Sequence, residues 1–141
     1  MKTRRTFIKE FGGIAAVTCC GAGMVTLLEG CTSVKSIQGS WENKRLKVSL
    51  AEMGDDKFAI IRFDKLPAPI FLSKNNEKSR AFLMLCTHNE CELKATGTYL
   101  YCPCHGSEFS STGKVLKPPA EDNLKEYPVT ADNTTIYIEL N

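Results

Sequence analysis

The sequence predicts an all-β domain, built as an antiparallel sandwich or small barrel. Short stretches in which apolar and polar residues alternate recur along the chain, and turn-forming Asn, Gly, Asp and Pro residues separate them. Beyond residue 31, no long segment shows the apolar period of a helix. The chain has 141 residues, 43% of them apolar, which leaves room for one such domain behind a leader.

Residues 1–31 have the pattern of a targeting segment. The run Thr3 to Lys9, with its paired arginines, resembles a twin-arginine export signal, which carries folded proteins across a membrane. An uncharged run from Phe11 to Leu28 follows. It ends near Cys31, which resembles the lipidated residue of a lipoprotein leader, and the rival interpretation is an uncleaved membrane anchor. Either way, the N-terminus is expected at a membrane.

The segment 32–44 is rich in polar residues and predicts a tether, so the domain is expected to span residues 45–141. The segments with strand patterns are 46–50, 58–63, 69–73, 81–85, 98–101 and 134–140. The first two flank a turn at residues 53–56 and are expected to form an antiparallel pair. The last alternates apolar and polar residues, which is typical of a closing strand with one buried face.

The stretch from Cys86 to His105 contains both histidines of the chain and four of its seven cysteines. Thiolate and imidazole together suit a tetrahedral zinc ion or an iron-sulfur cluster. Zinc fingers usually group their cysteines as one pair and their histidines as another. Here each arm mixes the two types, as Cys86-x-His88 and as Cys102-x-x-His105, which favours a two-iron cluster that takes two thiolates and two imidazoles. Folding the arms around one cluster would also bring Cys91 and Cys104 together.

The motifs CTHNEC and CPCHGS resemble those of the disulfide-bearing Rieske proteins found in cytochrome bc complexes and as arsenite-oxidase-type small subunits. The resemblance implies a Rieske-type antiparallel β sandwich or barrel with a small cluster-binding subdomain, about residues 84–124, that carries a 2Fe-2S cluster. It also implies roles for seven residues: Cys86 and Cys102 on the inner iron, His88 and His105 on the outer iron, a disulfide between Cys91 and Cys104, and a hydrogen bond from Ser107 to the cluster.

Some positions depart from the family pattern. Phe109 stands where high-potential members have a tyrosine whose hydroxyl binds a ligand sulfur, so a lower potential is expected. Asn89 and Glu90 replace a usual Leu-Gly, which makes the tip more polar than the one that docks in a quinol site. Residues 118–124 still resemble the proline-containing third loop that covers the cluster.

Composition limits the classes of function that the chain can have. A net charge of +2 gives no indication of nucleic-acid binding, and the chain has no histidine outside the cluster motif for a catalytic set. The resemblance therefore implies an electron carrier without its own substrate-turnover site. It would be a subunit of a membrane-associated respiratory oxidoreductase of the quinol–cytochrome c reductase kind, with a redox partner subunit such as a cytochrome and with quinol as a further candidate partner.

Two alternatives stay open. One is a small Rieske partner of a periplasmic oxidoreductase of the arsenite-oxidase type, which the polar tip allows. The other belongs to a different class, a surface lipoprotein stabilised by zinc or disulfides that has a binding role. In the Rieske interpretation the disulfide places the domain outside the cytoplasm, on the periplasmic side of the cell membrane.

Overall fold

The computed structural model describes residues 33–75 and 78–140 of the chain, all within one compact unit, Cys31–Asn141. The predicted leader, its twin arginines and Cys31 lie outside the described residues. Thirteen strands and one short helix make up the described part. No helix among these residues is long and apolar enough to cross a membrane.

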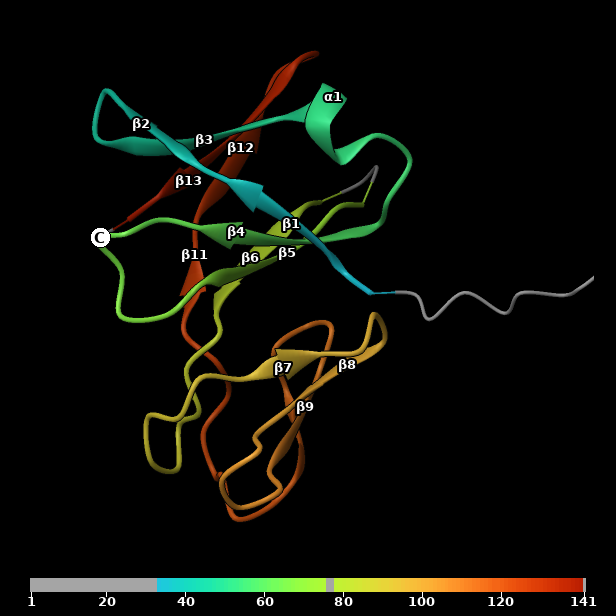
Figure 1. Cartoon of the computed structure of the whole chain (residues 1–141), viewed down its shortest axis with the longest axis vertical. Coiled ribbons are helices and arrows are strands. Elements are labelled where there is room, and N and C mark those ends of the chain that lie inside the picture. The colour runs from blue at the N-terminus through green and yellow to red at the C-terminus, as the bar shows by residue number, and fades with distance from the viewer. Residues whose placement is uncertain (1–32, 76–77, 141) are drawn as a thin grey trace, which may run out of the picture. The chain divides into compact units, whose positions relative to one another are not determined.

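The strands form three sheets (Figure 1). A five-stranded sheet has the order β1-β4-β5-β6-β11, with β1 Lys35–Gln38, β4 Phe58–Arg62, β5 Ile70–Ser73, β6 Arg80–Leu83 and β11 Glu126–Tyr127. A base sheet has the order β12-β13-β3-β2, with β12 Val129–Ala131, β13 Thr135–Glu139, β3 Arg45–Ser49 and β2 Ser40–Glu42. A small sheet has the order β10-β9-β8-β7, with β10 Val115–Lys117, β9 Glu108–Ser110, β8 Tyr99–Tyr101 and β7 Lys94–Ala95.

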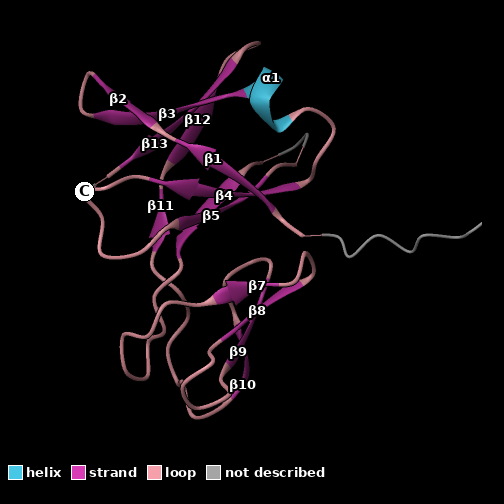
Figure 2. Ribbon diagram, viewed as in Figure 1, coloured by secondary structure: helices cyan, strands magenta, loops and turns pink. Residues whose placement is uncertain are grey.

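The five-stranded sheet is the middle layer, between the base sheet and the small sheet (Figure 2). Strand β5 shows why. Ile70 and Leu72 belong to the apolar core shared with the base sheet, whereas Phe71 between them belongs to the core shared with the small sheet. Because successive side chains of a strand point to opposite faces, β5 is buried on both sides and its sequence reads as a continuous apolar run. The all-β prediction is confirmed.

The expected tether at 32–44 is wrong for most of its length. Strand β1 pairs in parallel with β4, and β2 pairs antiparallel with β3. Two apolar residues in this polar segment explain the difference: Ile37 is only 5% exposed, in the core, and the Trp41 ring stacks on Phe63 with centroids 5.5 Å apart. One buried residue per short strand is enough to dock it, but too few to give a visible period.

The expected antiparallel pair of 46–50 with 58–63 is also wrong. Strand β3 pairs with β13 and β2, while β4 lies in the other sheet, between β1 and β5. The chain leaves β3 through the helix α1, Leu50–Met53, instead of a tight turn. Met53 is buried at the end of α1, so this connection helps to fill the space between the two sheets. It also links β3 of the base sheet to β4 of the five-stranded sheet.

Candidate metal centre

Two short loops carry the predicted ligands, at the edge of the small sheet. In the first, the Cys86 N–H donates to the Cys91 carbonyl at 2.9 Å and the Glu90 N–H donates to the Cys86 carbonyl at 2.8 Å. The second repeats this pattern: the Cys102 N–H donates to the Ser107 carbonyl at 2.8 Å, and the Gly106 N–H donates to the Cys102 carbonyl at 3.0 Å. Each loop is therefore a closed turn that presents the side chains between its ends.

The closure needs a positive φ at the same place in both loops. Glu90 has φ of 51° and Gly106 has φ of 78°. Glycine adopts this left-handed conformation readily, whereas a residue with a Cβ does so at a cost. The second loop therefore has the residue that its geometry favours, and the first has a glutamate held there by the loop.

A disulfide between Cys91 and Cys104 joins the loops, with the two Cα atoms 6.5 Å apart. This confirms the pairing expected from the resemblance. The Cys102 sulfur lies within 4.8 Å of both disulfide sulfurs. These three sulfurs do not make a metal site of their own, since the two sulfurs bonded to each other are not thiolates. The disulfide instead fixes the first loop beside the thiol of the second.

The four predicted ligands separate into a buried pair and an exposed pair. Cys86 and Cys102 are free thiols with only 1% and 2% exposure. His88 and His105 are exposed, and their ring centroids lie 5.0 Å apart with the rings nearly perpendicular. The structure thus brings together two thiols on the core side and two imidazoles on the solvent side.

The surroundings of Cys86 favour its thiolate. Burial raises the pKa of the Cys86 thiol, but hydrogen bonds from the His88 and Asn89 backbone, from Cys102 and from the Ser107 hydroxyl outweigh burial, and the pKa lies below its ordinary value. These donors stabilise negative charge on sulfur, which is the form that binds metal.

Ser107 connects this ligand to the third loop. It is fully buried, its Oγ accepts a hydrogen bond from the Ala120 N–H at 3.0 Å, and its hydroxyl is among the groups that lower the pKa of the Cys86 thiol. The sequence did not indicate the Ala120 contact, because a backbone donor leaves no trace in residue type. A second contact was also missed: the Thr87 hydroxyl donates to the Asp122 carbonyl at 2.7 Å.

The third loop, which includes a cis peptide bond between Pro118 and Pro119, thus contacts both ligand loops. Gly113 anchors its far end, since its carbonyl accepts from the Leu124 N–H at 2.9 Å. A side chain at Gly113 would come within 2.5 Å of the Phe82 ring. Only glycine fits between this loop and the middle sheet.

The departures from the family pattern are visible in the structure. Phe109 is fully buried in the core beneath the small sheet. Asn89 and Glu90 are exposed at the tip of the first loop. The first loop therefore presents polar side chains to solvent at its tip.

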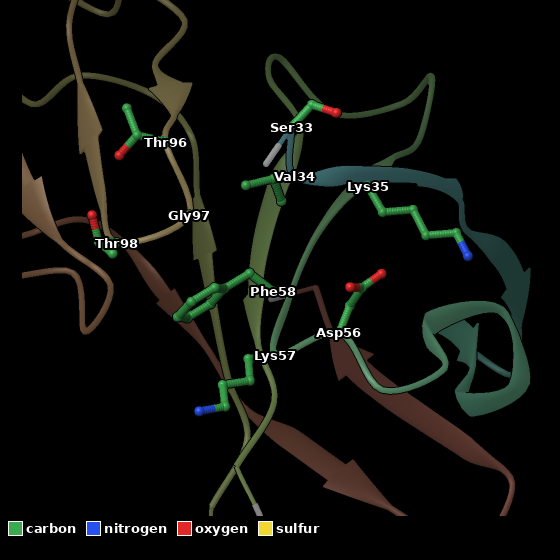
Figure 3. Close-up of a pocket in the computed structure, with 9 residues that line it drawn as sticks. All are labelled: Ser33, Val34, Lys35, Asp56, Lys57, Phe58, Thr96, Gly97 and Thr98. Carbon is green, nitrogen blue, oxygen red and sulfur yellow. The ribbon is translucent and has the colours of Figure 1, made fainter. Parts of the chain in front are cut away.

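The donor set fits a two-iron cluster with mixed ligands. Two buried thiols, one of them surrounded by hydrogen-bond donors, and two solvent-side imidazoles match the ligand types of such a centre. A pocket of about 280 Å³ lies elsewhere, between the start of β1, the start of β4 and the β7–β8 turn, and none of the four predicted ligands lines it (Figure 3).

Comparison with known proteins agrees with this donor set. Residues 40–128 match the model of the Rieske [2Fe-2S] domain. The chain is 26% identical over 130 residues to the ubiquinol-cytochrome c reductase iron-sulfur subunit of Bradyrhizobium diazoefficiens, with 86% of this chain and 74% of that protein aligned. It is 36% identical over 56 residues to the cytochrome b6-f complex iron-sulfur subunit of a Synechococcus strain, with 38% of this chain and 32% of that protein aligned.

Among solved structures, the fold is similar to that of the cyanobacterial plasma membrane Rieske protein of Synechocystis PCC 6803. The TM-score is 0.55 and the sequence identity 29%, with 65% of this chain and 95% of that chain covered. The ferredoxin of carbazole 1,9a-dioxygenase from Nocardioides aromaticivorans, at 19% identity and a TM-score of 0.50, shares the fold.

Proposed function

Because the chain belongs to the Rieske [2Fe-2S] domain family, we propose that it is an electron carrier whose cluster is held by Cys86, His88, Cys102 and His105. One observation carries the proposal. Two loops of the same geometry, joined by a disulfide, bring two buried free thiols and two exposed imidazoles to one place.

The burial of the ligands supports their separate roles. The buried thiols of Cys86 and Cys102 would hold the inner iron, and the exposed imidazoles of His88 and His105 would hold the outer iron on the solvent side. The bound group supplies one-electron oxidation and reduction. Two neutral imidazoles in place of two thiolates lower the negative charge of the ligand set, which favours a higher potential than that of an all-thiolate ferredoxin.

Ser107 tunes this potential from the protein side. Its hydroxyl donates to the sulfur shell, and a donor stabilises the reduced state because that state carries more negative charge on sulfur. Phe109 has no hydroxyl to add a second donor from the core. We therefore place the potential in the lower half of the class range, which is roughly −150 to +300 mV.

The carrier functions as a subunit of a membrane-associated respiratory oxidoreductase, with a redox partner subunit. The curated relatives named above support this, as iron-sulfur subunits of ubiquinol-cytochrome c reductase and of the cytochrome b6-f complex. The disulfide fits an oxidising compartment, on the periplasmic side of the cell membrane. The leader, residues 1–31, provides the membrane attachment, through twin-arginine export and either lipidation of Cys31 or an uncleaved anchor.

A second candidate is a small Rieske partner of a periplasmic oxidoreductase of the arsenite-oxidase type. The exposed Asn89 and Glu90 favour it, because a polar tip is poorly suited to an apolar quinol pocket.

Low-temperature EPR of the dithionite-reduced full-length chain, with iron and sulfide analysis, tests the cluster. About two irons and two sulfides per chain, with the low average g that imidazole ligation gives, are expected. His105→Ala should abolish the signal, and Asn123→Ala, a change in the third loop, should leave it. Zinc at the same ligands with no EPR signal would overturn the electron-transfer function in favour of a zinc-stabilised surface protein.

A further inference from the structure

The exposed imidazoles define where a redox partner must approach. His88 and His105 are both exposed, and the two thiols behind them are buried. In Figure 1 the loops that carry them lie beside and below the small sheet, away from the base sheet. If electrons pass through these imidazoles, as the proposed function states, the partner contacts the residues that surround them.

Three exposed residues of the His88 loop and of the third loop beside it are acidic. Glu90 is exposed two positions after His88, in the same closed loop. Glu121 and Asp122 are exposed in the third loop, and the Thr87 hydroxyl binds the Asp122 carbonyl at 2.7 Å, which places that loop against the residue next to His88. We call Glu90, Glu121 and Asp122 the acidic rim.

The rim carboxylates differ from the other acids of this subdomain. Glu92 lies 3.8 Å from Lys94 and Glu108 lies 3.2 Å from Lys117, so cations of the same subdomain offset these charges. Among the described residues, no ion pair involves a rim carboxylate. The unbalanced negative charge therefore gathers beside the imidazoles.

The net charge of the whole subdomain is also negative. Residues 84–124 contain five carboxylates and three lysines, whereas the rest of the described chain contains eleven Lys and Arg residues and eight carboxylates. The subdomain with the imidazoles is thus negative and the remainder positive. Such a separation turns the negative end toward a positive surface during diffusional encounter.

An apolar partner surface does not fit this tip. Moving an ionised carboxylate from water into an apolar pocket is costly unless a partner charge compensates it, and three exposed carboxylates are in the His88 loop and in the third loop that contacts it. A basic partner surface supplies that compensation. Charge complementarity therefore selects the partner.

We propose that the acidic rim with His88 and His105 is the docking surface for a redox protein that presents lysine and arginine side chains around its own redox centre. This proposal rests on the proposed function, since it takes the imidazoles as the route of the electron. It adds the chemistry of the partner and the residues that recognise it.

The test is stopped-flow oxidation of the reduced, cluster-loaded full-length chain by a basic c-type cytochrome, over a range of ionic strength. The rim variant combines Glu90→Gln, Glu121→Gln and Asp122→Asn. Its second-order rate constant at low salt should fall about tenfold or more. The difference should disappear in high salt, because the Debye length there is only about 3 Å.

The matched control removes the same charge from exposed residues of the rest of the domain, through Glu52→Gln, Asp55→Asn and Asp64→Asn. The control should keep most of the wild-type rate. An equal loss in both variants would overturn the proposal, because only net charge would then matter. So would an unchanged rim variant, no reaction of the wild type, or a wild-type rate that rises with salt.

EPR on the same samples separates this failure from that of the proposed function. Without a cluster signal, the electron-transfer function itself is wrong. With a full cluster signal and an unchanged rim variant, the function stands and the basic partner is wrong.

Discussion

Replacement of Ser107 by alanine tests how the protein tunes its cluster. The Ser107 hydroxyl helps to lower the pKa of the Cys86 thiol and accepts from the Ala120 N–H at 3.0 Å in a fully buried position. The variant loses a donor that favours the reduced state, so its midpoint potential should fall. A preference of about 1–1.4 kcal/mol for the reduced state corresponds to roughly 40–60 mV for one electron.

The same substitution should lower stability through a separate contact. It leaves the buried Ala120 N–H without its acceptor, which costs about 1–3 kcal/mol. Redox titration followed by EPR measures the first effect, and denaturant unfolding measures the second. Ser110→Ala is the matched control, since the Ser110 Oγ also accepts backbone N–H bonds, from Thr112 at 3.2 Å and from Lys114 at 3.1 Å.

The control should lose some stability and keep its potential, because Ser110 is in a strand-end turn and donates to no ligand in the described structure. A Ser107→Ala protein with a full cluster and an unchanged potential would refute the role of this hydroxyl. Equal potential shifts in both variants would refute it too, since a general loosening of the hairpin would then explain them.

Four further substitutions test individual features of the domain. Phe109→Tyr should raise the potential by about 40 mV if its hydroxyl reaches a ligand sulfur, a shift that redox titration measures. Cys91→Ser with Cys104→Ser should lower the free energy of unfolding by about 3 kcal/mol, as expected for a disulfide with a sequence separation of 13, in denaturant unfolding under oxidising conditions. Glu90→Gly should raise the free energy of unfolding by about 0.5–1 kcal/mol, because glycine tolerates φ of 51°, and a loss instead would contradict the backbone argument. Two backbone N–H groups and a tyrosine hydroxyl hold the pKa of Asp132 at about 2, below its usual 3.8. Ionised Asp132 therefore stabilises the fold above about pH 4, and this contribution is lost as the pH falls toward 2. The melting temperature of Asp132→Asn should depend less steeply on pH in that range than the melting temperature of the wild type.

The sequence predicted the strands that bury several residues in a visible pattern. Strand β13 alternates Ile136 and Ile138, both buried, with polar or half-buried neighbours, and its position was correct. Its partner was not predicted, because alternation shows which face is buried but not which strand lies alongside. The turn residues 53–56 predict that β3 pairs with β4, whereas β3 pairs with β13.

The candidate site was more predictable than the sheets. Ligand chemistry restricts residue types, so the Cys and His spacing alone indicated the two loops, and the Cys91–Cys104 disulfide is present as expected. Contacts made by the backbone stayed hidden. The Ala120 N–H and the Asp122 carbonyl are available in any residue type, so no sequence pattern marks the third loop as the element that connects both ligand loops.

Glu90 combines a left-handed backbone position with an exposed charge. From the sequence it is a departure at the tip, and from the structure it occupies the left-handed position that Gly106 occupies in the matching loop. The disulfide at the adjacent Cys91 and the bond from the Glu90 N–H to the Cys86 carbonyl hold this backbone in place. The loop geometry therefore does not need glutamate, and a glycine would remove the cost of the positive φ at this position. What the glutamate adds is an exposed negative charge beside His88, so this position affects the choice of partner more than the stability of the loop.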